Sequence, residues 1–163
     1  MNSKVPEVTF YKPKSEDLWF RRAMLEDPET MSYNRAWGGT IPFPREKWAD
    51  WYDCWVANPK KRFYRYIMTG QDGAFAGEAA WHYDPDLNVY LADIIIAAER
   101  RRQGFGRAGL LLLCETAGRE GIPALYDNIA AGNPGISLFL QCGFREEYRT
   151  EEIIMLKKTL REA

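Results

Sequence analysis

Apolar and polar positions follow two different periods along the chain. Over residues 18–25 and again over 48–55, apolar side chains recur every three or four positions, which predicts two amphipathic helices. From residue 62 the pattern changes to short runs of aromatic and β-branched residues, which predict strands over 62–70, 74–83 and 89–97. Turn-forming sequences separate these runs, so we expect the three strands to form a meander of hairpins.

The rest of the chain adds elements of both kinds. Strands are predicted over 5–11, 123–130 and, as a final pair, 144–158, and helices over 104–120 and 133–141. The order is strand, two helices, three strands, helix, strand, helix and two strands. It predicts one α/β (α+β) domain over residues 1–163, with a mixed, mostly antiparallel sheet of about seven strands flanked by about four helices.

Length and composition narrow the class of protein. The chain has 163 residues, of which 46% are hydrophobic and 28% charged, and a net charge of -1; these values are ordinary for one globular domain. Such a charge gives no reason to expect a nucleic-acid or anionic membrane partner. The N-terminus has no apolar leader, and no run approaches the roughly 20 apolar residues of a membrane span. We therefore expect a soluble, cytoplasmic protein.

Cysteine usage agrees with that location. The three cysteines lie far apart and lack the spacing of a zinc or redox site: Cys54, Cys114 and Cys142. Unpaired thiols are typical of a reducing compartment. We expect no disulfide and no metal.

One glycine-rich stretch, at the start of the helix predicted over 104–120, raises a question of function. Gly104-x-Gly106-x-x-Gly109 has the spelling of a dinucleotide-binding loop, and Asp127 follows at about the distance of that motif's ribose ligand. However, the preceding strand ends near Ala97, several residues too early, and it belongs to a hairpin rather than to a parallel crossover unit. The context therefore argues against a dinucleotide fold, and Gly109 is expected only to allow close helix packing.

The same stretch has the physical properties of an anion site. A helix N-terminus presents unpaired amides, glycines let a ligand approach the backbone, and three consecutive arginines, Arg100 to Arg102, add positive charge. A pyrophosphate would fit there. The alternative is that the glycines simply permit a tight turn and the arginines are solvated.

Two motifs in register resemble a known superfamily. Arg101-x-x-Gly104-x-Gly106, between the strand ending "LADIIIA" and a leucine-rich helix, resembles the acetyl-coenzyme A signature of the GNAT N-acetyltransferases. Downstream, "GNPGISLFLQCGF" resembles that superfamily's asparagine loop, short helix and terminal Gly-Phe. The resemblance implies a GNAT-like acyl-coenzyme A N-acyltransferase fold, with acetyl-coenzyme A as co-substrate.

The resemblance also implies which residues bind the coenzyme. The backbone of three strand residues would hold the pantetheine arm like an added strand: Ile94, Ile95 and Ile96. Beside Arg101 of the signature, the pyrophosphate would lie on the amides of the following segment: Arg102, Gln103, Gly104, Phe105, Gly106 and Arg107. Asn133 would bind the pantetheine arm, and Phe139 would lie beside the thiol. Core packing is an equally good reason for the three isoleucines, and the two roles are compatible.

Attack on a thioester requires a neutral amine, so a base is needed. Asp93, just before the pantetheine-binding segment, and Asp127, on the following strand, are the candidates, while Glu78 is a weaker one and His82 is expected to have a packing role. Members of the superfamily often carry a tyrosine at position 139 to protonate the departing thiolate. This chain has phenylalanine there, so the acid is left open among Tyr126, Tyr148 and water.

The acceptor is expected to bind between the first two helices and the loop around residues 147–152. Tyr33, Trp37 and Gly38 are predicted to form the lip of the pocket, whereas the aromatic residues of the second helix are expected to be a buried face. The implied reaction is acetyl transfer to a primary amine of a small molecule or a peptide N-terminus, and a homodimer is compatible with it. The alternative is a non-catalytic module that binds or senses acyl-coenzyme A.

Overall fold

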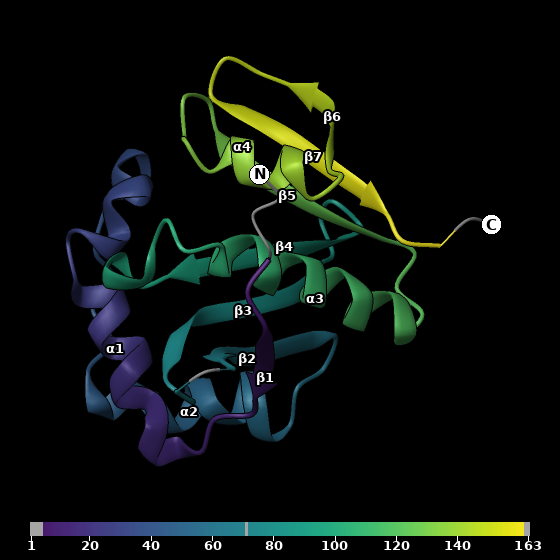
Figure 1. Ribbon diagram of the computed structural model, residues 1–163. Coiled ribbons are helices and arrows are strands. Elements are labelled where there is room, and N and C mark those ends of the chain that lie inside the picture. Colours follow the sequence, from purple (N-terminus) through teal and green to yellow (C-terminus); the bar gives the residue numbers. More distant parts are fainter. Residues whose placement is uncertain (1–4, 71, 162–163) are drawn as a thin grey trace.

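A computed structural model describes residues 5–70 and 72–161. The strands form one open sheet in the order β1-β2-β3-β4-β5-β7-β6 (Figure 1). Every neighbouring pair is antiparallel except β4 and β5, which are parallel. The strands are β1 (Val8–Tyr11), β2 (Arg62–Thr69), β3 (Phe75–Asp84), β4 (Val89–Ile96), β5 (Ala124–Ala130), β6 (Arg145–Arg149) and β7 (Ile153–Thr159). The predicted mixed, mostly antiparallel sheet is confirmed.

The helices follow the predicted order with shifted ends. Those that position the site are α1 (Leu18–Glu26), η2 (Thr30–Trp37), α2 (Trp48–Tyr52), α3 (Phe105–Arg119) and α4 (Ile136–Gln141). The segment between the first two predicted helices contains the 3-10 helix η2. The helix predicted from Asn133 begins only at Ile136, because the Asn133 side chain caps a turn by accepting a hydrogen bond from the Gly135 amide at 2.7 Å.

Helices cover both faces of the sheet, and each face has its own core. On one face α3 and α4 pack on the sheet through a cluster that includes Leu110, Leu113 and Phe139. On the other face α1, η2 and α2 pack through a cluster that includes Leu18, Met31 and Tyr64 (Figure 1). Alternate residues of one strand therefore belong to different cores.

Gly109 has the packing role expected of it. A Cβ atom at this position would lie 2.5 Å from Cδ1 of the fully buried Ile67 on β2. The missing side chain therefore lets α3 lie directly on the sheet. None of the helices in the described ranges has both the length and the apolar character needed to cross a lipid bilayer.

The parallel pair at the centre of the sheet separates soon after it forms. Tyr90 pairs with Leu125 and Leu91 with Tyr126, and the register between β4 and β5 goes no further. The rest of β4, Ala92 to Ile96, still pairs with β3 on its other edge. The backbone edge of β4 that faces β5 is therefore left open after Leu91. We call this separation of β4 from β5 the splay.

Candidate functional site

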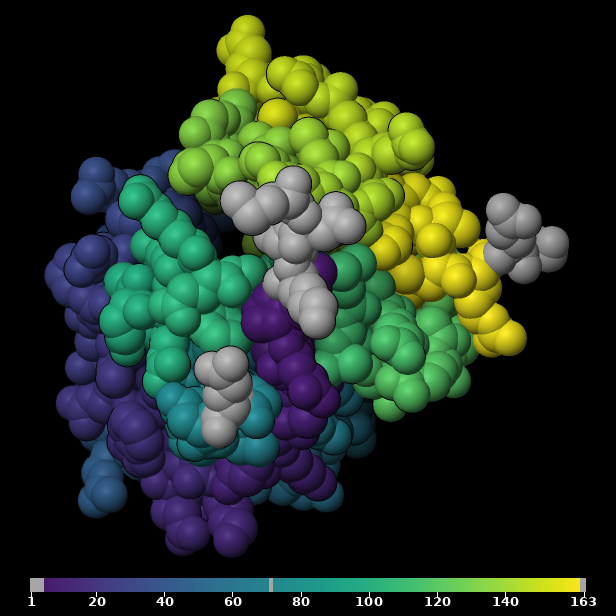
Figure 2. Space-filling model, in the orientation of Figure 1, coloured from purple at the N-terminus to yellow at the C-terminus, as the bar shows by residue number. Residues whose placement is uncertain are grey.

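A cavity of about 1190 Å³ opens at the splay and reaches both faces of the sheet. Its lining comes from α1, η2, α2 and the residues after it, the strands β2, β3, β4 and β5, the start of α3 with its preceding loop, and α4 with its preceding loop. The hollow is visible where the blue, teal-green and yellow-green segments meet (Figure 2). Its volume is that of a site for a large organic ligand.

The loop before α3 presents backbone amides to this cavity. Arg102 and Gly104 have φ values of 63° and 86°, and Phe105 begins the helix. The first amides of α3 have no acceptor within the helix, and they lie at the positive end of its dipole. Residues 101–107 all line the cavity, as predicted. This geometry favours an anion such as a pyrophosphate.

The Arg101 side chain links two segments of the backbone. Its guanidinium donates hydrogen bonds to the main-chain carbonyls of Glu29, at 3.0 Å, and Thr30. The Thr30 hydroxyl in turn accepts a hydrogen bond from the Ala98 amide at 3.0 Å. Arg100 lies 3.7 Å from Asp72. Arg101 therefore ties the loop to the start of η2, and because its acceptors are neutral carbonyls, its positive charge remains beside the cavity.

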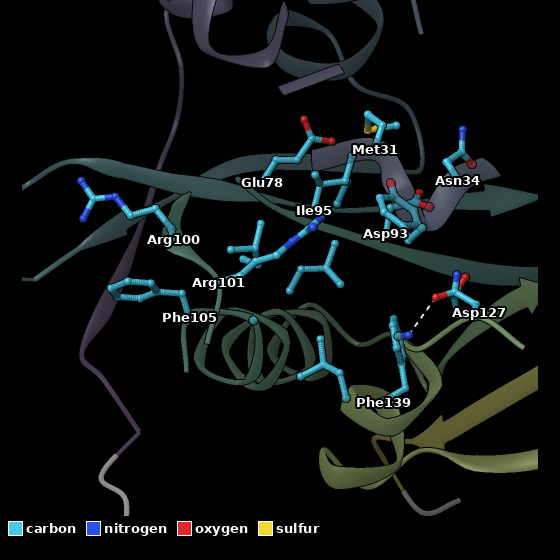
Figure 3. Close-up of a pocket in the computed structure, with 18 of the residues that line it drawn as sticks. Met31, Asn34, Glu78, Asp93, Ile95, Arg100, Arg101, Phe105, Asp127 and Phe139 are labelled. Atoms are coloured by element: carbon cyan, nitrogen blue, oxygen red, sulfur yellow. Dashed lines mark hydrogen bonds between the residues drawn. The ribbon is translucent and has the colours of Figure 1, made fainter. Parts of the chain in front are cut away.

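The predicted binding strand and its neighbours line the middle of the cavity. Ile94, Ile95 and Ile96 lie beyond the splay, and their open backbone edge can accept an extended ligand arm. Their side chains also pack in the two cores, so the packing role expected of them is present. Asn133 lines the side formed by α4 and its loop. The buried Phe139 lies on the same side (Figure 3).

The two candidate carboxylates lie on opposite faces of the sheet at the splay. On β5, Asp127 lies between Leu125 and Ile129, which both pack in the core under α3 and α4. On β4, Asp93 precedes Ile95 by two residues, and Ile95 packs in the core under α1 and η2. Because side chains alternate along a strand, Asp127 faces α4 and Asp93 faces η2. Both line the cavity (Figure 3).

Asp127 is held in an environment that favours its neutral form. Burial, and secondly the charge of Asp93, raise the pKa of Asp127 well above its ordinary value of 3.8. The nearby Tyr33 responds in the same direction: burial and then the charges of Glu78, Asp93 and Asp127 raise the pKa of its phenol. The cavity at the splay therefore favours the protonated forms of both Asp127 and Tyr33.

Asp93 is exposed to the cavity and has a partner on the neighbouring strand. Nδ1 of His82 lies 3.5 Å from Oδ2 of Asp93. Hydrogen bonding to Asp93 raises the pKa of His82, and burial opposes this effect only in part. The His82 ring also packs edge-on against Trp55 at 5.7 Å between centroids. The packing expected of His82 is present, and its ring also lies next to a candidate base.

The acceptor side of the cavity is largely aromatic. Tyr33 and the half-exposed Trp37 line it as predicted. Gly38, predicted with them, ends η2 with a φ of 109° and lies outside the lining. The loop around 147–152 also lies outside the lining, which corrects that expectation. Trp51 and Trp55 are half-buried and line the cavity, so the second helix is only partly the buried face that its periodicity indicated.

A buried ion pair under this wall was missed by the sequence reasoning. Arg21 Nη1 donates to both carboxylate oxygens of Glu78, at 2.6 and 2.8 Å, and the Tyr64 hydroxyl donates to Glu78 at 2.6 Å. The guanidinium lies 4.3 Å above the Trp51 ring. A signal was available, because Arg21 falls on the apolar stripe of α1 together with Leu18 and Leu25. A charge at such a position predicts a buried partner.

Comparisons with known proteins agree with this geometry. The family model described as "Acetyltransferase (GNAT) family" matches residues 21–144. A comparison with curated protein sequences gave no significant match.

Solved structures with the same fold cover nearly the whole chain. One is spermidine N-acetyltransferase from Vibrio cholerae, in complex with CoA and spermine: the TM-score is 0.78 at 18% identity, over 94% of this chain and 95% of that one. Another is a GNAT-family acetyltransferase from Bacillus anthracis, with a TM-score of 0.74 at 12% identity over 98% of each chain. At these identities the similarity shows the fold.

Proposed function

The chain belongs to the GNAT acetyltransferase family, and from this premise we propose that it transfers the acetyl group of acetyl-coenzyme A to the primary amine of a small molecule. The observation that carries the proposal is the continuity of the cavity through the splay. The amide loop and the open edge of β4 lie toward one face of the sheet, and Asp93 and the aromatic wall lie toward the other. A thioester and an amine entering from the two sides would meet at the splay.

The residues of the splay can carry out direct transfer. An amine is an ammonium ion near neutral pH, so it must lose a proton before it attacks the thioester carbonyl. Asp93 is exposed on the acceptor face, where it can accept this proton. Nδ1 of His82 lies 3.5 Å from Oδ2 of Asp93. The free amine then attacks the acetyl carbon directly, without an acetylated enzyme intermediate.

Charge balance on the acceptor side supports a narrow class of amine. The negative charge of Glu78 is neutralised by Arg21, and Asp127 favours its neutral form, so Asp93 is the carboxylate left to attract a cation. The surrounding wall is apolar and aromatic: Leu25, Met31, Tyr33, Trp37, Ile41, Trp51 and Trp55. One ammonium group next to an aromatic or aliphatic body fits this wall, through apolar burial and cation–π contact. A polyamine would leave its further ammonium groups without carboxylate partners.

The test is release of the coenzyme A thiol from acetyl-coenzyme A with a panel of amines. We expect turnover with arylalkyl monoamines, weaker turnover with amino acids and dipeptides, and the weakest with spermidine. Preferred turnover of spermidine would contradict the acceptor class. Coenzyme binding measured by calorimetry, without thiol release by any amine, would contradict the activity and favour a non-catalytic acyl-coenzyme A-binding module, which the phenylalanine at position 139 makes the second candidate.

A further inference from the structure

The coenzyme side of the cavity contains no hydroxyl at the position where the family resemblance placed an acid. Phe139 lies on α4, is buried, and packs edge-on against Phe144 at 4.9 Å between ring centroids. Tyr126 and Tyr148, the substitutes considered from sequence, are not among the residues that line the cavity. The acid near the thiol is therefore either water or another side chain of the cavity.

Asp127 is the titratable side chain on the same face as Phe139. It is the first residue of β5 after the last pair with β4, so it lies at the apex of the splay. Leu125 and Ile129, its neighbours on this face, belong to the same core as Phe139. Figure 3 shows Asp127 and Phe139 on the side of the cavity away from Glu78. The arm of a coenzyme laid along the open edge of β4 would end beside this carboxyl group.

We propose that Asp127 is the general acid of the reaction and protonates the sulfur of coenzyme A as it leaves. The inference rests on the proposed acetyl transfer and assigns the group that completes it. Two carboxylates on opposite faces of the splay then have separate roles, with Asp93 as base toward the acceptor and Asp127 as acid toward the coenzyme. Pairs of acids in unlike environments divide their roles in this way.

The amine nitrogen forms a bond to the acetyl carbon, and the carbonyl electron pair moves to oxygen. When the carbonyl re-forms, the carbon–sulfur bond breaks and its electron pair stays on sulfur. Asp127 gives its carboxyl proton to that pair, so the product is the thiol. Asp93 first passes the proton of the ammonium ion to solvent, and then takes the second proton, which the nitrogen loses after the attack. Solvent in the open cavity returns a proton to Asp127 for the next turnover.

The surroundings keep Asp127 able to donate. The titratable groups that interact with it across the cavity are Asp93 from β4 and Tyr33 from η2, and no cation is among the causes of its shift. Burial and the charge of Asp93 both favour the protonated carboxyl, and the amide of Asn128 opposes them more weakly. General acid catalysis requires this proton to be present near the working pH.

The experiment measures single-turnover rates between pH 6 and 10 at a constant concentration of free amine. With the wild type, we expect the rate to fall at alkaline pH as Asp127 loses its proton. With Asp127→Asn, that alkaline limb should disappear, and the rate at neutral pH should fall about 100-fold. This factor is the lower end of the range for general acid catalysis, because a thiolate leaves readily even without an acid. An acidic limb that disappears instead would make Asp127 the base, and an unchanged profile would assign the proton to water; either result overturns the proposal.

A second pair of variants separates the chemical role from a structural one. Phe139→Tyr in the Asp127→Asn background places a hydroxyl on α4 and should recover at least about tenfold in rate, whereas Phe139→Met in the same background should recover none. Equal recovery by both, or none by either, contradicts the assignment. If Asp127→Asn fails to fold, Phe139→Tyr in the wild type is measured instead, and an alkaline limb that it leaves unchanged counts against the proposal.

The wild type distinguishes failure of this inference from failure of the proposed function. If the wild type binds acetyl-coenzyme A and acetylates no amine, the activity is wrong and the acid role falls with it. If the wild type acetylates an amine, and Asp127→Asn either loses the acidic limb or keeps an unchanged pH profile, only the assignment of the acid is wrong.

Discussion

The Arg101 guanidinium is hydrogen-bonded to the main-chain carbonyl of Thr30, and so joins the loop before α3 to the start of η2. These two segments lie on opposite sides of the splay, one toward the anion site and the other toward the acceptor wall. Thr30 adds a second link through its hydroxyl and the Ala98 amide. The position of the coenzyme loop and the shape of the acceptor wall therefore depend on one another.

Replacing Arg101 should weaken both sites together. Arg101→Ala removes charge-assisted hydrogen bonds and is expected to cost about 1–2 kcal/mol in the free energy of unfolding, to raise the Kd for coenzyme A, and to raise the KM for the amine. Arg119→Ala is the matched control. Arg119 is exposed, and its ion pair with the helix neighbour Glu115, at 3.9 Å, is expected to contribute little to stability. Calorimetry and steady-state kinetics test this, and an unchanged amine KM would argue against the coupling.

Gly104 should tolerate no side chain. Its φ is 86°, and an added Cβ would lie 2.7 Å from Cδ of Pro6, so Gly104→Ala is expected to distort the amide loop and weaken coenzyme A binding at least about tenfold. Gly118→Ala, at a position in α3 where the added Cβ meets only Leu160 at 3.8 Å, should leave binding unchanged. Adding Pro6→Gly separates the clash from the backbone strain; full recovery would show that φ is unimportant here.

Gly109→Ala should destabilise the fold without a direct effect on ligands. Its Cβ would overlap Cδ1 of Ile67 in the fully packed core, and we expect a loss of about 1–3 kcal/mol in urea unfolding. Ile67→Val removes that carbon atom and should recover part of the loss in the double variant. Simple additivity of the two variants would contradict the proposed contact.

The titration of His82 can be followed cleanly because it is the single histidine of the chain. Hydrogen bonding to Asp93 raises its pKa above the ordinary 6.5. A raised pKa stabilises the fold below about pH 6.5, and this stabilisation is lost as the pH rises through the raised value. We expect Asp93→Asn to lower the pKa of His82, measured by NMR of the ring carbons. An identical titration in both proteins would mean that the two residues do not interact.

The stability of the wild type should depend on pH through Asp127. Because the folded-state pKa lies well above 3.8, the folded protein favours the protonated carboxyl, and stability is lost as the pH rises from about 4 through the raised pKa. Asp127→Asn removes this dependence, so the variant should gain stability relative to the wild type with increasing pH. Urea midpoints at pH 4.5 and 8.5 test the sign, and parallel values for the two proteins would exclude a raised pKa.

Much of the fold was predictable from local patterns. The meander over residues 62–97, the long helix α3 that ends shortly before Gly121, and the final strand pair all follow from periodicity and turn residues. The boundaries were less predictable where a side chain competes with the helix, as at Asn133, whose carbonyl caps a turn and delays α4 to Ile136.

The candidate site was only partly predictable. The glycine loop and both aspartates could be located in the sequence, since their residue types and spacing are local features. The ion pair of Arg21 and Glu78 joins residues 57 positions apart, and nothing in either local pattern specifies the other partner. The hydrogen bonds of the Arg101 side chain to two main-chain carbonyls at the start of η2 could not be predicted for the same reason.

Local sequence patterns were enough to predict the order of the elements and the glycine loop at residues 101–107, and the lack of a hydroxyl at Phe139 is a property of the sequence. The separation of β4 and β5 after Leu91 and Tyr126 is visible only in the folded chain, as is the placement of Asp93 and Asp127 on opposite faces of the sheet. Alternation along a strand fixes which residues share a face, but which helices cover that face, and where two strands stop pairing, depends on contacts between distant parts of the chain.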